Sequence, residues 1–271
     1  MKSRYLPSIL SLACALQIGL PCAVLADHAT DSLTLEFIEL QFHYKEELPA
    51  PFKSTEHKWL SGGALTYRHI GINQPYLQLR GELAGGPAHF DGTTQTGIPV
   101  MDTTEELLGR AEGLFGYTWQ PSSERRFALT PYAGLGYRYW RRALGDGNVE
   151  TYTWGYGSVG LRMDWWRGRW GLVPEIAGRF PFGGNLNVDL PGFDPLDLKL
   201  GSRPGFIGQL AAVYRLAPRW VARLTGSFEE SRIGQSPVGV LTSGGVPIFA
   251  VYEPSSRTEI IMAGIGITYL F

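Results

Sequence analysis

Cysteine is almost absent from this chain of 271 residues, and both copies, Cys14 and Cys22, lie within the first 26 residues. A protein that loses this segment has no thiol, which excludes a disulfide framework and a thiolate metal site. The formal net charge of −1 gives no electrostatic case for nucleic-acid binding. Long apolar runs are missing as well. Beyond residue 26 the longest uncharged stretch, 233–252, contains two prolines and four glycines and would form a poor membrane helix.

The N-terminus has the order of features that is typical of an export signal. Lys2 and Arg4 precede an apolar stretch, 6–20, which is followed by Val-Leu-Ala before position 27. This order predicts a secretory signal peptide that directs export through the Sec pathway and is then removed. We therefore expect residues 1–26 to be the signal peptide and residues 27–271 to form one domain.

Ten segments of the remaining chain alternate between apolar and polar residues. In 126–142, for example, Phe127, Leu129 and Leu135 fall on one face, while Arg138 and Arg142 fall on the other. A β-strand that spans a membrane needs only about 9–11 residues with this period of two. The predicted strands are 32–44, 58–72, 76–86, 106–119, 126–142, 150–166, 169–182, 205–216, 219–231 and 257–271, and a change of phase near Ile38 predicts a bulge in the first.

The connections between these segments alternate in length. Short turns are expected at 73–75, 120–124, 167–168 and 217–218, and longer loops at 45–57, 87–105, 143–149, 183–204 and 232–256. Bacterial barrels have short periplasmic turns and long extracellular loops. The pattern predicts an all-β, antiparallel, up-and-down transmembrane β-barrel of ten strands in the outer membrane of a Gram-negative cell.

Aromatic residues gather beside the short turns and at the C-terminus. Amphipathic rings prefer the headgroup zone, so a ring of them at one level indicates a membrane interface. The expected girdle comprises Tyr117, Trp119, Trp165, Trp170, Trp220, Tyr269 and Phe271, and Tyr76 is assigned to it on the same ground.

If apolar residues face lipid, the alternate positions face the lumen, and these positions are rich in charge. The expected lumen charge network is Arg80, Glu82, Arg110, Glu112, Arg138, Arg162, Asp164, Glu175, Arg179 and Arg223. Arg215 and Glu229 are expected to face the lumen on the same ground. Arginine suits a confined lumen because its planar group stays ionised and can bond two carboxylates. Two interpretations remain open: a salt-bridged plug that fills the barrel, or the lining of a narrow porin-like channel for small solutes.

Three stretches carry a family resemblance. The run 130–140 (TPYAGLGYRYW), the loop 94–100 (TQTGIPV) and the C-terminal ITYLF resemble a broad group of poorly characterised proteobacterial outer-membrane barrel proteins. By strand number the chain is also similar to Opc-type adhesins. The alternating C-terminus that ends at Phe271 resembles the signature which the barrel-assembly machinery recognises. The resemblance implies that machinery, outer-membrane lipid and lipopolysaccharide as partners, and it implies no substrate.

Enzymatic motifs are not evident in the sequence. The omptin proteases share the ten-stranded architecture and use an acidic pair facing an Asp–His pair, but this chain has no such motif, and His89-Phe90-Asp91 is its nearest approach. Asp189, Asp194 and Asp197 lack the spacing of a calcium loop. We expect no catalytic residue, no metal and no cofactor.

The external loops carry the functional information that remains. The last is unusually apolar, and the sequence leaves two interpretations of it open. The flanking strands could extend as a hairpin that buries these residues against other loops, or the loop could form an exposed adhesive patch. We expect a non-enzymatic outer-membrane protein with a surface or envelope-interaction role and an unidentified extracellular ligand. The narrow channel is the alternative, and a protease or lipid-modifying enzyme is a weaker one.

Overall fold

A computed structural model describes residues 30–93, 98–120, 127–145 and 147–271. The segment expected to be a signal peptide, most of the turn expected at 120–124 and part of the loop at 94–100 lie outside these residues. The described residues contain no helix that is long and apolar enough to cross a membrane.

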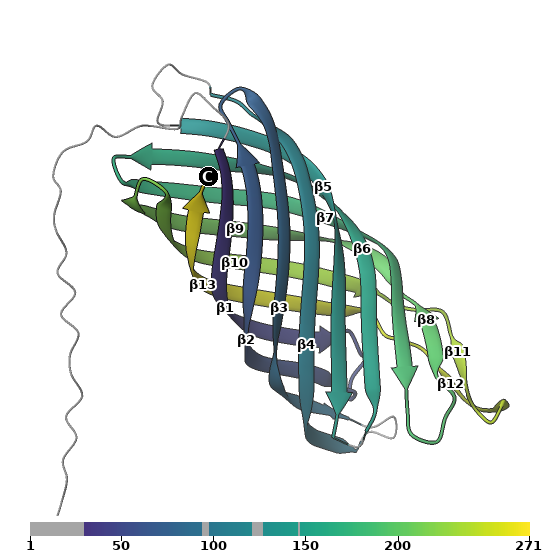
Figure 1. Ribbon diagram of the computed structural model, residues 1–271. Coiled ribbons are helices and arrows are strands. Elements are labelled where there is room, and N and C mark those ends of the chain that lie inside the picture. The colour runs from purple at the N-terminus through teal and green to yellow at the C-terminus, as the bar shows by residue number, and fades with distance from the viewer. Residues whose placement is uncertain (1–29, 94–97, 121–126, 146) are drawn as a thin grey trace, which may run out of the picture.

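Ten long antiparallel strands close into a barrel (Figure 1). They are β1 (Thr30–Glu46), β2 (Ser54–Ile70), β3 (Gln74–Thr93), β4 (Pro99–Thr118), β5 (Phe127–Leu144), β6 (Val149–Arg167), β7 (Trp170–Asp189), β9 (Gly201–Ala217), β10 (Trp220–Gly234) and β13 (Ser256–Leu270). Each strand pairs with the next in this order, and β13 pairs with β1 to close the ring. The predicted ten-stranded fold is confirmed.

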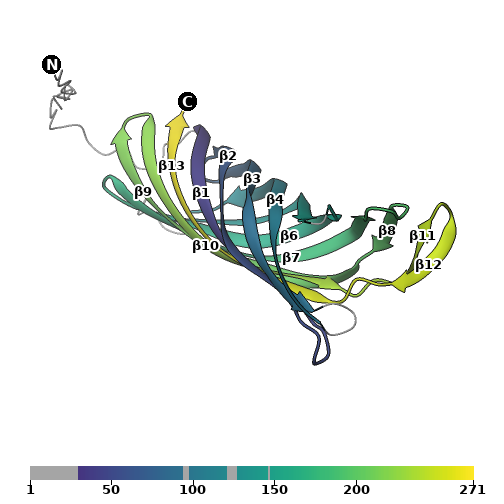
Figure 2. The same cartoon turned by 90° about the horizontal axis from the view of Figure 1, so that it is seen from below.

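Three short strands decorate one end of this barrel. The strand β8 (Leu196–Lys199) pairs with the end of β7. The strands β11 (Gly239–Ser243) and β12 (Val246–Val251) form a hairpin between β10 and β13. We call the end of the barrel where β1 begins and β13 ends the near end, and the opposite end the far end. Both views place the hairpin beyond the far end (Figures 1 and 2).

The strands are longer than the sequence pattern predicted, and most of the predicted long loops are wrong in their bounds. Thus β3 and β4 run on through most of 87–105, and β1 and β2 take up the two ends of 45–57. The physical reason is that an outward position needs an apolar side chain only where lipid surrounds it. Above that level the backbone ladder continues while the alternation of hydrophobicity fades.

The bulge predicted near Ile38 is also wrong. The register of β1 is continuous against both neighbours, from Ser32 to Glu46 against β13 and from Thr30 to Lys45 against β2. What changes at this residue is the chemistry of the two faces. Leu35 and Phe37 are exposed on the outside, whereas Ile38, Leu40 and Phe42 are buried inside the barrel.

The outer surface of the near half of the barrel is an apolar belt. Exposed apolar side chains occur there on every strand, and they include Leu35, Leu65, Leu79, Phe115, Leu135, Val159, Ile176, Leu210, Leu224 and Ile265. Five of the expected girdle residues, Tyr117, Trp119, Trp170, Trp220 and Phe271, are exposed at or beyond the near ends of the strands. Trp165 and Tyr269 are half-buried, and Tyr269 contacts the rings of Trp220 and Phe271.

Tyr76 does not belong to this ring. Its side chain is fully buried in the lumen, and its hydroxyl donates to Gln78 Oε1 at 2.9 Å. Tyr76, the third residue of β3, therefore faces inward on the same face as Arg80 and Glu82, and its assignment to the girdle is wrong.

Candidate functional site: the filled lumen and the far rim

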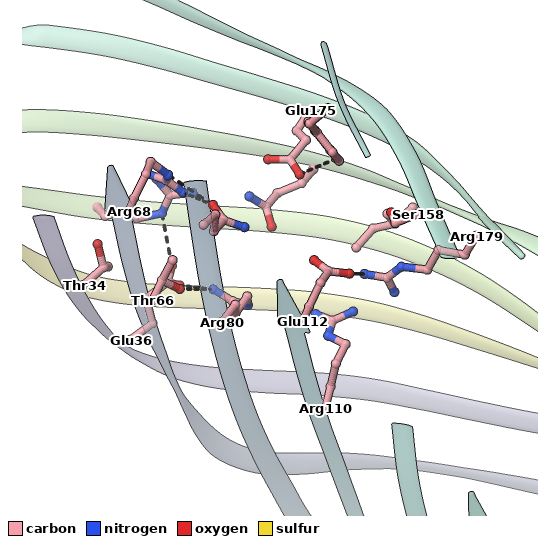
Figure 3. A pocket seen from close by; sticks show the side chains of 15 residues that line it. Thr34, Glu36, Thr66, Arg68, Arg80, Arg110, Glu112, Ser158, Glu175 and Arg179 are labelled. Carbon is pink, nitrogen blue, oxygen red and sulfur yellow. Dashed lines mark hydrogen bonds and ion pairs between the residues drawn. The ribbon is translucent and has the colours of Figure 1, made fainter. Parts of the chain in front are cut away.

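The ten residues of the expected lumen network all point into the barrel in the structure. The side chain of each is at most 13% exposed. Figure 3 shows Arg80, Arg110, Glu112, Glu175 and Arg179 converging from different strands. Two further carboxylates lie at its centre: Glu229, which was expected to face the lumen, and Glu36, which was not.

Glu229 of β10 is held by three arginines. Its carboxylate pairs with Arg110 Nη1 at 2.9 Å, Arg138 Nη2 at 2.7 Å and Arg179 Nη1 at 2.8 Å. Arg138 and Arg179 approach from β5 and β7, and Arg110 crosses the lumen from β4. This one side chain therefore ties strands on opposite sides of the barrel together.

Glu36 of β1 is the second centre of the network. It accepts from Arg80 Nη1 at 2.7 Å, Arg223 Nε at 3.2 Å and Thr225 Oγ1 at 2.7 Å. Sequence reasoning missed it because the bulge assumed near Ile38 left the facing of β1 undefined.

The remaining members pair locally. Glu82 accepts from Arg80 and Arg110, and Arg162 donates to both oxygens of Asp164 at 2.8 and 2.7 Å. Glu112 accepts from Tyr156 and Arg179, and Tyr132 donates to Glu175. With Glu36 and Glu229 included, the network contains six arginines and six carboxylates, so the formal charges of these twelve residues balance. Arg68, which lines the same cavity and donates to Gln78, adds one positive charge beside them. A balanced, mutually bonded set is the form in which charge is tolerated in a confined interior.

Little space is left between these side chains. A cavity lined by Glu36, Arg80, Arg110 and Arg179 has a volume of about 20 Å³. A second, between Glu82, Arg138 and the side chains above them, is also about 20 Å³. Each is large enough for about one water molecule and far too small for a sugar or an amino acid.

An apolar layer covers the charged network on the side of the far end. It is formed by buried side chains of seven residues, Ile38, Leu40, Leu60, Ala84, Leu108, Ile260 and Met262. Above it Trp140 stacks on Tyr152, with ring centroids 4.4 Å apart, and makes edge contacts with Phe42 and Tyr44. The barrel is thus closed by two chemically different layers in series.

A third layer at the far end is acidic. We call Glu46, Glu56, Glu106, Glu150 and Glu253 the rim carboxylates. Within the described residues their arginine partner is Arg142, which donates to Glu56 at 2.6 Å and to Glu150 at 2.7 Å. Tyr44 and Tyr152 both donate to Glu253, at 3.2 and 3.0 Å.

The rim carboxylates have too few positive partners to balance their charge. Their burial disfavours the charged form further. Burial raises the pKa of Glu253 to about 8, and repulsion from Glu150 and Glu46 acts in the same direction. Burial likewise raises the pKa of Glu56 to about 8, although Arg142 opposes the shift. At neutral pH the rim therefore retains protons. Sequence reasoning missed this layer because most of its residues fall in the segments predicted to be loops.

The histidines do not join this layer. His43, His57 and His89 are exposed on the outer face of β1, β2 and β3, where they are register neighbours. Asp91, the acidic neighbour of His89 in sequence, is paired with Lys53. Among the described residues, no group of three or more His, Cys, Asp or Glu side chains is placed to hold a metal ion.

The far end also carries the hairpin of β11 and β12. It is fixed to the loop before β8 by Asp194, whose Oδ2 accepts from Thr242 Oγ1 at 2.6 Å and from the Gly245 N–H at 2.9 Å. Of the two interpretations of this loop, burial of its apolar residues against other loops is wrong for most of the hairpin. Val246, Ile248 and Phe249 are exposed, by 59%, 46% and 57%, and only Leu241 of the hairpin is buried.

Comparison with known proteins identifies the fold of this chain but not a family. No family model matches the chain, and no curated protein matches it in sequence. The structure of the outer membrane protease OmpT from Escherichia coli matches with a TM-score of 0.57 and 11% identity, over 94% of this chain and 99% of that one. OprG from Pseudomonas aeruginosa matches with a TM-score of 0.35 and 12% identity, over 88% of this chain and 95% of that one. Ail of Yersinia pestis has a TM-score of 0.35 and 11% identity, over 89% and 99%.

The match to OmpT, at this low identity, concerns the fold alone. The chain has the closed, ten-stranded, antiparallel architecture of bacterial outer-membrane barrels. Membership in the poorly characterised proteobacterial group stays a prediction.

Proposed function

We propose that this chain is a non-enzymatic, sealed barrel of a bacterial outer membrane, exported through the Sec pathway, whose far end makes contacts outside the cell. The apolar belt and the aromatic residues at the near end support this orientation, because short turns and chain termini lie in the periplasm in such barrels. The observation that carries the proposal is the filled lumen: a neutral charged network and an apolar layer lie in series, and the cavities found between their side chains are of water size.

Insertion through the barrel-assembly machinery fits the geometry of β13. Its outward residues Ile261 and Ile265 are exposed apolar side chains, as is Phe271 directly after it, and β13 pairs with β1 to close the barrel. Outer-membrane lipid and lipopolysaccharide are then the partners of the outward belt. We expect no cofactor.

A channel function receives little support from this lumen. Passage of a solute would require several buried ion pairs and the stacked aromatic side chains to move aside together. Proteolysis receives little support either, because Glu56 and Glu106 are buried and the far-end histidines face away from the mouth.

The proposal is tested by removing the far-end hairpin. Residues 237–252 are replaced by a short Gly-Ser connection, and the variant is expressed at the bacterial surface beside the wild type. We expect the wild type to increase adherence of the bacteria to cultured epithelial cells or to one another. The deletion should abolish that increase while the barrel keeps its heat-modifiable gel mobility. Expression without any gain in adherence would contradict a surface-interaction role.

A further inference from the structure

The hairpin of β11 and β12 exposes apolar side chains on both of its faces. In β12, Val246 and Pro247 lie opposite the adjacent residues Ser243 and Thr242 and so point to opposite sides. A register shift in the pairing of β12 with β11 places Ile248 between Pro247 and Phe249, and all four residues are exposed. Val238, Val240 and Tyr252 add exposed apolar surface beside it, with exposed fractions of 66%, 50% and 47%. Monomeric soluble surfaces rarely gather such side chains, so the patch marks a contact site.

The hairpin is held in a fixed position. The Asp194 carboxylate accepts hydrogen bonds from the Thr242 hydroxyl and from the Gly245 N–H at the tip of the hairpin. The Asp194 N–H donates to the Thr242 carbonyl at 2.7 Å. Leu241 is buried, and the position of a β-carbon on Gly239 would meet the side chains of Leu196 and Leu198 of β8. The exposed side chains are therefore presented by a rigid support rather than by a collapsed loop.

The membrane that holds the barrel cannot cover this patch. Ion pairs lie at the base of the hairpin: on β10 and β13, Arg257 pairs with Glu230 at 2.5 Å and Arg232 with Glu230 at 2.7 Å, and beside them Arg203 of β9 pairs with Glu47 at 3.0 Å. The three arginines are 42–45% exposed. Such charges stay out of hydrocarbon, so the hairpin beyond them lies on the aqueous side (Figures 1 and 2).

The chemistry of the hairpin indicates what kind of surface it contacts. Residues 233–252 contain no charged side chain, so they offer nothing to complement a charged protein surface. A groove on a protein would cover one face of β12, whereas a fluid apolar medium covers both. Addition of a further strand along β12 is disfavoured by Pro247, which has no N–H to donate.

We propose that the hairpin inserts into the lipid bilayer of an apposed membrane, through Val246, Ile248 and Phe249. This inference rests on the proposed function, since it names the surface that the far end contacts. Apolar side chains flanked by Thr242, Ser243 and Tyr252 suit the boundary between headgroups and acyl chains, and rigid presentation lowers the entropic cost of insertion.

The test uses the full-length barrel in lipid nanodiscs, so that its own belt is already covered by lipid. Nanodiscs are mixed with phosphatidylcholine vesicles and centrifuged through a density gradient. The wild type should float with the vesicles, and the double variant Ile248→Ser/Phe249→Ser should show a vesicle partition coefficient at least about tenfold lower. Met101→Ser is the matched control, because Met101 is a 73% exposed apolar residue of the far half that lies outside the hairpin. It should float like the wild type.

A second measurement follows insertion directly. The chain has no cysteine after residue 22, so Ile248→Cys gives the exported protein a single position for an environment-sensitive fluorophore. Vesicles should raise its emission and shift it to the blue, and should leave a label at Met101→Cys unchanged.

Three results would overturn the inference. One is failure of the wild type to float. The second is equal flotation of the wild type and the double variant. The third is association of nanodiscs with each other in the absence of vesicles, which would make a second copy the occupant. If one of these results were found while adherence in the cell assay still depended on residues 237–252, the proposed surface role would stand. Only the identification of lipid as the target would be rejected.

Discussion

The arginines of the lumen depend on very few acceptors. Glu229 pairs with Arg110, Arg138 and Arg179, and its side chain is only 7% exposed. An ion buried in a confined interior is tolerated when its partners are in place, and removal of one partner leaves the others desolvated and unpaired. Glu229 is therefore the residue at which the network is most vulnerable.

Substitution of this acceptor should destabilise the barrel strongly. We expect Glu229→Gln to lower the free energy of unfolding by about 3 kcal/mol, because three guanidinium groups lose their common counter-charge. Urea unfolding in lipid or detergent, followed by tryptophan fluorescence, measures the change. Glu47→Gln is the control: its exposed side chain pairs with the exposed Arg203, and its loss should cost less than about 1 kcal/mol. Equal stability of Glu229→Gln and the wild type would contradict the account of the plug.

The rim carboxylates make stability depend on pH. Burial and neighbouring carboxylates raise the pKa of Glu253 to about 8 in the folded barrel, whereas an unfolded glutamate titrates near 4.5. Between these values the folded state holds a proton that the unfolded state releases. Stability should therefore fall as the pH rises, with a slope of up to about 1.4 kcal/mol per pH unit for one group.

The predicted measurement is the melting temperature between pH 5 and pH 9. It should decrease in the wild type over this range, and Glu253→Gln should reduce the slope because an amide stays neutral. Glu105→Gln, at an exposed position of β4, should keep the slope of the wild type. A wild-type melting temperature that is flat across the range would show that the rim holds no shared protons.

At this scale the sequence predicted which residues face inward and not which residues pair. Alternation alone places Arg80, Arg110 and Arg138 in the lumen. The pairing of Arg110 with Glu229, however, joins residues 119 positions apart across the barrel, and depends on side-chain reach that no periodicity encodes.

At the scale of elements, the strands were predicted where lipid imposes a pattern. All ten predicted segments correspond to barrel strands because the outward face of each must be apolar within the membrane. The far ends of the strands were predicted too short because outward positions such as Lys45 and His57 face water, where no pattern is imposed. The hairpin of β11 and β12 has apolar residues on both faces, so alternation could not reveal how it is exposed.

The attachment of this hairpin rests on one loop residue. Asp194→Ala removes the acceptor of two hydrogen bonds, from Thr242 and Gly245, so we expect backbone amides of β11 and β12 to exchange with solvent several-fold faster. Hydrogen exchange with mass spectrometry measures the effect, while the barrel strands should be unaffected. Asp189→Ala, at an exposed position at the end of β7, is the control. Unchanged exchange in Asp194→Ala would mean that packing on β8 alone fixes the hairpin.

At the scale of the whole molecule, the barrel is a support closed by stacked layers. The charged network spans the near half, the apolar layer lies above it, and the rim carboxylates and stacked aromatic residues cover the far end. Ten strands enclose a lumen only slightly wider than one that side chains can fill, so a few bulky residues suffice to seal it.

The most direct test of this account is the single-channel conductance of the refolded barrel in a planar bilayer, with its folding verified by heat-modifiable gel mobility. A sealed lumen predicts no steady current above that of the protein-free bilayer at any applied voltage. Discrete, reproducible conductance steps would contradict it, and would make the lumen arginines and carboxylates the lining of a channel.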